Sequence, residues 1–157
     1  MLGPALAAAL AAAPAPPLIA SEKGVIPAPV YGAPIALGRA LAMMAAAKQR
    51  SAELGFPGCT VAITGPDGSL VAFERMDATT YVSIEFAIAK ARTAAISRRP
   101  TGPAPDGTMT VPTPDLIALP GGFPIVVSGQ TIGGIGVSGT AGGDVAIAQS
   151  ALAAAQH

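Results

Sequence analysis

The sequence predicts an α+β domain in which helices flank an antiparallel β-sheet in an α-β-α layered arrangement. Two pairs of β-rich runs each enclose a turn signal, which is the pattern of a β-hairpin. Their strands are expected at residues 59–64 and 69–75, and at residues 123–127 and 131–138. Segments with helical patterns lie before, between and after the hairpins. A chain of 157 residues has room for one such core.

Three helices are expected, at residues 34–54, 81–97 and 144–156. Pro34 suits the first turn of a helix, and Gly55 follows its last residue. Asp144 opens the third helix as an N-cap or first-turn anion, where the helix dipole favours a negative charge. Residues 98–114 are rich in proline and are expected to form a loop.

Helical periodicity assigns a buried face to the first two helices. In the first helix this face carries Leu37, Leu41, Met44 and Ala47. In the second helix it carries Ile84, Ile88 and Ala91. These residues are therefore expected to pack on the sheet.

The last strand is unusually rich in glycine. Alternation places Ile132, Gly134, Gly136 and Ser138 on one of its faces. Such a strand has little side chain to pack, so another part of the structure must approach it closely. Two interpretations stay open, namely an alanine-rich helix lying tight against the sheet and a flat ligand that reaches the backbone.

The N-terminal region is expected to lie outside the core domain, which covers residues 35–157. Residues 1–20 form an Ala/Pro/Leu run with a signal-like apolar stretch, although the basic region that precedes such a stretch is missing. This pattern favours a periplasmic or secreted protein, with a cytoplasmic one as the alternative. The run is too short and too proline-broken to span a membrane. Residues 21–34 form a proline-rich arm, either a linker or a segment that packs on a neighbouring subunit.

Composition excludes several classes of function. The formal net charge is zero and aromatic residues make up 4% of the chain, so neither a basic surface nor stacking platforms for nucleic acid are expected. The single cysteine, Cys59, excludes an intrachain disulfide framework. Ser138 lacks the G-x-S-x-G frame of a nucleophile elbow, and the single histidine is the terminal His157. No catalytic residue is assigned.

Polar residues concentrate around the second helix. Arg75 and Asp77 follow a strand end on the same side by alternation, and Asp77 is the nearest counter-charge in sequence for Lys90. Arginine and lysine could hold a carboxylate, whereas the alternative is a structural ion pair that fastens helix to hairpin. The predicted ligand-binding residues are Arg75, Asp77, Ser83, Lys90, Thr93 and Thr101.

Several motifs carry a resemblance to a known family. They are YGAPI at 31–35, GSLVAFERMD at 68–77, Ser83, KARTA at 90–94, RRPT at 98–101, LPGG at 119–122, Pro124-Ile125, IGGIGVSG at 132–139 and Asp144. On these motifs the chain resembles the GlcG/HbpS family of haem-binding proteins, which is related to the C-terminal domain of PduO-type proteins. The resemblance implies the layered fold described above, assembly into dimers or octamers, and haem as the cofactor. It leaves the axial ligand of the iron unassigned, with Cys59, His157, Tyr31, Tyr81 and the four internal methionines as possible ligands.

The leading hypothesis is therefore a small, exported, homo-oligomeric protein that binds haem for capture or degradation. The alternative is an enzyme or binding module for a small carboxylated metabolite that uses Arg75, Asp77 and Lys90. A third hypothesis is a structural oligomer without chemistry.

Overall fold

Both predicted hairpins are present and join into one sheet through the last strand. The structure is a computed structural model that describes residues 29–103 and 115–156. The first hairpin consists of β2 (Thr60–Thr64) and β3 (Leu70–Arg75), and the second of β4 (Gly122–Val127) and β5 (Gln130–Ser138). Strand β5 runs antiparallel to both β4 and β2, so the order across the sheet is β4-β5-β2-β3.

The two hairpin turns have the backbone geometry that their residues predict. Gly68 adopts φ +82° at the end of the β2–β3 turn, and the Gly65 N–H donates to the Ser69 carbonyl. The β4–β5 turn is a two-residue loop in which Ser128 and Gly129 have φ of 50° and 75°. Positive φ at both central positions gives the twist that suits tight hairpins.

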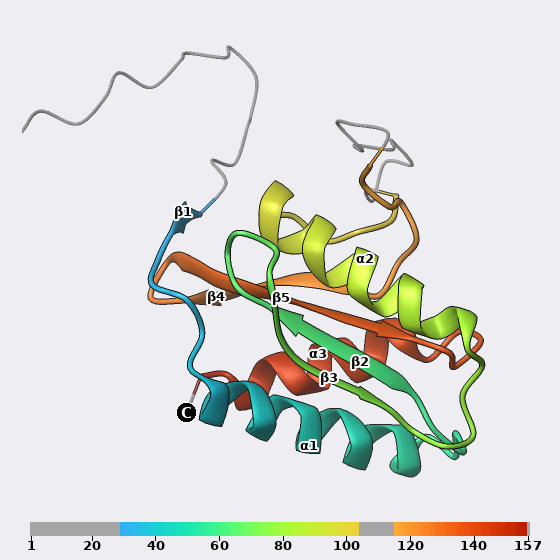
Figure 1. Ribbon diagram of the computed structural model, residues 1–157. Helices are drawn as coiled ribbons and strands as arrows, with labels where there is room; N and C mark the ends of the chain where they lie inside the picture. Colours follow the sequence, from blue (N-terminus) through green and yellow to red (C-terminus); the bar gives the residue numbers. More distant parts are fainter. Residues whose placement is uncertain (1–28, 104–114, 157) are drawn as a thin grey trace, which may run out of the picture.

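Helices cover both faces of the sheet, as the predicted α-β-α layering requires (Figure 1). Helix α2 (Val82–Ser97) lies on one face, across β5, β2 and β4. Helices α1 (Leu37–Glu53) and α3 (Asp144–Ala154) pack together on the other face. In the part of the chain that the structure describes, every helix is too short or too polar to cross a membrane.

Helix α2 approaches β5 closely, which explains the glycines of this strand. A Cβ added to Gly136 would lie 2.1 Å from the carbonyl oxygen of Ala87, and one added to Gly134 would lie 2.2 Å from that of Ala91. The interpretation of an alanine-rich helix against the sheet is therefore confirmed. Ala87 and Ala91 are fully buried at this contact.

Two details of the predicted helix faces are wrong. Ile84 and Ile88 are only half-buried, because the glycine surface of β5 admits alanine but leaves no depth for isoleucine. Leu37 and Leu41 are exposed, at 56% and 53%. The buried face of α1 instead follows the i, i+3, i+4, i+7 spacing of Ala40, Met43, Met44 and Ala47. Leu41 lies about 100° round the helix from Ala40, on the solvent side.

The described part of the N-terminal arm packs on its own chain. Strand β1 (Val30–Tyr31) pairs in parallel with the start of β5. The Tyr31 hydroxyl donates to the Ile96 carbonyl at 2.7 Å, and the Arg98 guanidinium lies 4.8 Å from the centre of the Tyr31 ring. Arg98 also donates to the Pro29 carbonyl at 3.2 Å. The signal-like run 1–20 and most of the arm lie outside the described residues.

Candidate functional site

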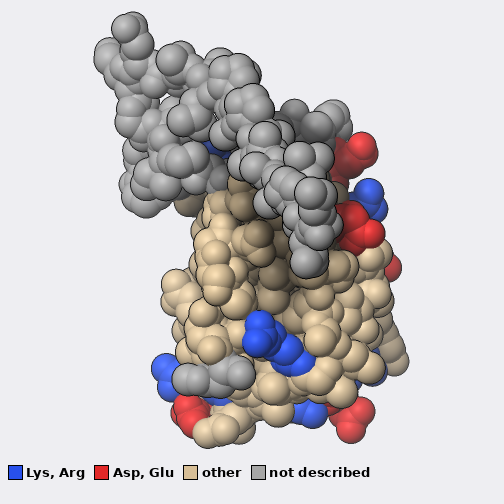
Figure 2. All heavy atoms as spheres, turned by 90° about the vertical axis from the view of Figure 1, so that its left-hand side faces the viewer, with Lys and Arg blue, Asp and Glu red and all other residues tan. Residues whose placement is uncertain are grey.

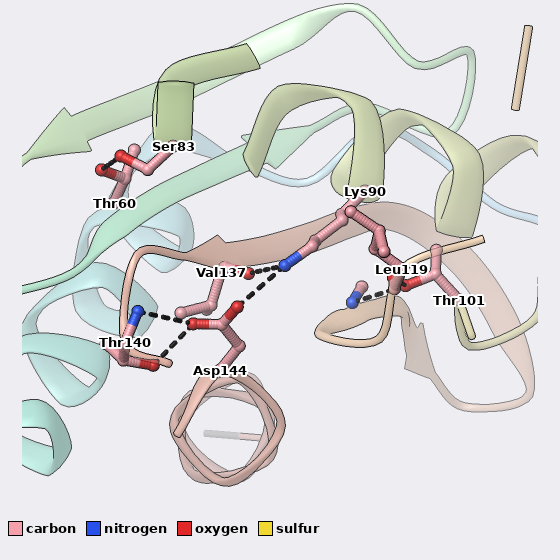
Figure 3. Close-up of polar contacts among 9 residues, drawn as sticks. Thr60, Ser83, Lys90, Thr101, Leu119, Val137, Thr140 and Asp144 are labelled. Carbon is pink, nitrogen blue, oxygen red and sulfur yellow. Dashed lines mark hydrogen bonds and ion pairs between the residues drawn. The ribbon is translucent and has the colours of Figure 1, made fainter. Parts of the chain in front are cut away.

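Lys90 carries a charge into the interior of the molecule. Its side chain is 3% exposed, and its Nζ donates to the Val137 carbonyl at 2.8 Å and to Asp144 Oδ2 at 2.9 Å. Asp144 Oδ1 in turn accepts hydrogen bonds from the Thr140 N–H and hydroxyl, at 3.1 and 2.6 Å. Lys90 therefore connects α2, on one face of the sheet, with the first residue of α3 on the other (Figure 3).

The counter-charge of Lys90 is thus Asp144, and the expectation of Asp77 is wrong. The antiparallel course of β5 brings its C-terminal end and the start of α3 beneath α2, so proximity in space does not follow proximity in sequence. Glycine at position 121 makes room for the pair, because an added Cβ would lie 2.9 Å from Asp144 Cβ and 3.3 Å from Lys90 Nζ. The ammonium is already neutralised by this partner.

Two predicted threonines hold the segment that precedes β4. The Thr93 hydroxyl oxygen accepts a hydrogen bond from the Ile117 N–H at 3.0 Å. The Thr101 hydroxyl donates to the Leu119 carbonyl at 2.6 Å and accepts from the Gly122 N–H at 2.8 Å. Both residues are buried, so these hydroxyls fix backbone groups rather than face a cavity.

Ser83 is also engaged inside the protein. Its hydroxyl lies 2.6 Å from that of Thr60 on β2, and both residues are buried (Figure 3). Since Thr60 lies at the start of a central strand, the contact fastens the first turn of α2 to the sheet. Four of the predicted residues therefore make structural contacts inside the protein, namely Ser83, Lys90, Thr93 and Thr101.

Arg75 and Asp77 line a cavity of about 350 Å³, which we call the charged pocket. Its lining residues are Lys48, Pro57, Glu74, Arg75, Met76, Asp77 and Ala78. Lys48 Nζ lies 2.9 and 3.0 Å from the two carboxylate oxygens of Glu74, which joins α1 to β3. Of the predicted residues, Arg75 and Asp77 share this cavity and Lys90 does not line it.

A second cavity, of about 460 Å³, is lined by Tyr31, Pro66, Asp67 and Ile96, and we call it the apolar pocket. Asp67 is turned to its own loop, where its Oδ1 accepts hydrogen bonds from the N–H and hydroxyl of Ser69. These bonds lower the pKa of Asp67 below its ordinary value. The face at the β1 end of the molecule carries few charged side chains over its described part (Figure 2). No local sequence pattern indicates this cavity, because its walls come from three separate segments of the chain.

Cys59 and His157 gain no support as iron ligands. Cys59 is fully buried, and its Sγ lies 3.8 Å from Met76 Sδ. Burial raises the pKa of the Cys59 thiol, which keeps it protonated near neutral pH. His157 lies outside the described residues. Within residues 29–103 and 115–156, no cluster of three or more His, Cys, Asp or Glu side chains could hold a metal ion.

Comparison with known proteins gives consistent matches. The family described as haem degrading protein HbpS-like matches residues 35–153. Protein GlcG of Escherichia coli K12 is 38% identical over 98 residues, which cover 59% of this chain and 73% of GlcG. The crystal structure of HbpS is similar with a TM-score of 0.72 and 27% identity, over 88% of this chain and 100% of that one. The crystal structure of a PduOC–haem complex is similar with a TM-score of 0.67 and 27% identity, over 77% of this chain and 94% of that one.

Proposed function

Because the chain belongs to the HbpS-like family, we propose that it binds haem and serves in haem capture or degradation. The observation that carries this proposal is the family match over residues 35–153, together with the similarity to a protein solved in complex with haem. Bound haem would supply the iron and the redox chemistry, and the protein would supply a binding surface and charges for the propionates.

The apolar pocket is the cavity whose residues fit haem best. A porphyrin needs a flat apolar wall, which Tyr31, Pro66 and Ile96 offer in a volume suited to a cofactor. Arg98 lies over the Tyr31 ring, and Cγ of Arg92 is 2.8 Å from the position of a Cβ at Gly68, beside the same turn. Guanidinium groups there suit propionates, because they bind planar anions through two hydrogen bonds.

Tyr31 is the residue of this pocket that we propose as the iron ligand. A tyrosine oxygen ligates haem iron in some haem proteins. In the protein as described, the hydroxyl donates to the Ile96 carbonyl at 2.7 Å, so it lies at the cavity wall with its orientation fixed. Ligation would require this hydrogen bond to be given up.

A haemin titration tests the proposal. We expect a Soret band that saturates at one haemin per chain, and Tyr31→Phe should shift the band and weaken binding at least tenfold. The chain contains a second tyrosine, Tyr81, which stacks on Arg75 away from this pocket, so Tyr81→Phe is the matched control and should change neither. No saturable Soret change with the unmodified protein would contradict haem binding. A normal titration with Tyr31→Phe would contradict only the assignment of the ligand.

We also propose that the protein is a homo-oligomer, a dimer or an octamer, and that it is exported. Exposed Val30, Leu37 and Leu41 and the zero net charge support self-association, since little charge keeps the subunits apart. Light scattering should give a mass well above that of the 15.3 kDa chain. N-terminal sequencing of the mature protein tests export, because cleavage within residues 1–20 is expected.

A further inference from the structure

The charged pocket contains both signs of charge, and we propose that it binds a small zwitterion, a molecule with one carboxylate and one primary ammonium. The carboxylate would lie on Arg75 and the ammonium on Asp77. This site is separate from the apolar pocket and does not depend on haem binding.

Arg75 is held in position before any ligand arrives. Its Nη1 donates to the Thr79 carbonyl at 2.8 Å and to the Met76 carbonyl at 3.4 Å, and its guanidinium lies 4.9 Å from the centre of the Tyr81 ring. Its Nε and Nη2 donate no hydrogen bond to a described residue, which leaves donors for a carboxylate. A fixed guanidinium loses less conformational entropy on binding than a free one does.

Asp77 provides a negative charge next to this cation. It is exposed, and its carboxylate forms neither a hydrogen bond nor an ion pair with any residue in the described ranges. Strand β3 ends at Arg75, Asp77 lies in the turn that the Thr79 N–H closes on the Met76 carbonyl, and both side chains line the same pocket. They nevertheless do not pair with each other. The pocket therefore contains one cation and one anion that do not neutralise each other.

Charge balance within the pocket favours a ligand with both charges. Lys48 and Glu74 neutralise each other as a wall of the cavity, at 2.9 Å. Arg75 and Asp77 supply one charge of each sign, so a neutral zwitterion pairs both. A simple anion or a simple cation leaves one of the two groups uncompensated. Pro57, Met76 and Ala78 offer apolar contact for the methylene chain between the charges.

The test compares three ligands with the same carbon chain, measured by titration calorimetry on the full-length protein. We expect 4-aminobutyrate to bind at least tenfold more tightly than butyrate, which lacks the ammonium, and butylamine, which lacks the carboxylate. Asp77→Asn should reduce 4-aminobutyrate to the affinity of butyrate. Arg75→Lys should reduce it towards that of butylamine, because the fixed guanidinium is lost.

Arg50→Ala is the matched control for charge, because Arg50 pairs with Glu53 on α1 and does not line the pocket. It should leave all three affinities unchanged. The proposal is overturned if 4-aminobutyrate and its five- and six-carbon homologues bind no better than the singly charged ligands. It is equally overturned if the preference survives in Asp77→Asn while thermal unfolding shows that this variant is folded. Haemin binding should be unaffected by Asp77→Asn, so failure here is distinct from failure of the haem proposal.

Discussion

Replacing Gly136 by alanine should separate α2 from the sheet. The added Cβ would lie 2.1 Å from the Ala87 carbonyl oxygen, 2.5 Å from the Ala91 nitrogen and 3.0 Å from Lys90 Cβ. Ordinary contacts of a Cβ begin near 3.4 Å, so the helix would have to move by more than 1 Å. Two of the three obstacles are backbone atoms within a helix, which cannot rotate away as the end of a side chain can.

The cost follows from this geometry. Overpacking a core costs about 1–3 kcal/mol, and a backbone obstacle places this substitution at or above the upper end. Replacing glycine by alanine also reduces the conformational entropy of the unfolded chain, which stabilises the folded protein by about 0.5–1 kcal/mol. We therefore expect a net loss of about 2–4 kcal/mol in the free energy of unfolding, which corresponds to a fall of about 5–15 °C in Tm.

Urea unfolding followed by circular dichroism measures this loss directly. Gly38→Ala is the matched control, because Gly38 lies in α1 and an added Cβ meets no atom within 4 Å. It should not destabilise the protein, because alanine has a higher helix propensity than glycine. If Gly136→Ala unfolds within 0.5 kcal/mol of the unmodified protein, the close approach of α2 to β5 is wrong.

Three further predictions concern single polar groups. Lys90→Met should lower the free energy of unfolding by about 3–5 kcal/mol, since it leaves the Asp144 carboxylate without its buried partner, and adding Asp144→Asn should restore part of the loss. Ser69→Ala should raise the pKa of Asp67 towards its ordinary value of 3.8, as carbon-13 NMR would record. The stability that this contact contributes is present above that value and is lost as the pH falls through the lowered pKa of the folded state. Cys59 should resist iodoacetamide in the folded protein and react in urea, because burial raises its pKa; rapid labelling of the folded protein would refute its burial.

The elements that local patterns determine were predicted well. Both hairpins could be predicted from turn residues such as Gly68 and Gly129, because glycine is the residue that most readily adopts the positive φ of a tight turn. The tight approach of an alanine-rich helix followed from Gly134 and Gly136, because a strand without side chains must be covered closely. The family resemblance, which rests on these same motifs, is confirmed over residues 35–153.

The features that depend on distant parts of the chain were not predicted. Asp144 was identified as a helix-start anion, but nothing local indicates that Lys90, 54 positions earlier, lies above it. Strand β1 has no signal in the sequence, because two residues are too few to show the alternation of a strand. Its position is fixed by Arg98 and by the start of β5. The apolar pocket likewise needs Tyr31 and Ile96 together, and that juxtaposition exists only in the fold.

The place of β5 in the sheet determines when the protein can fold during synthesis. This strand is inserted between β2 and β4, yet only α3 follows it among the described elements. On a nascent chain, β2 therefore has one unpaired edge, and the alanine face of α2 has no glycine surface to pack on, until β5 emerges. Pairings between distant segments form slowly, so the cooperative step comes only after β5 has been synthesised. A chain that stops before β5 would lack the central strand. It would expose the unpaired edge of β2 and the alanine face of α2, and an unpaired strand edge can pair with another chain.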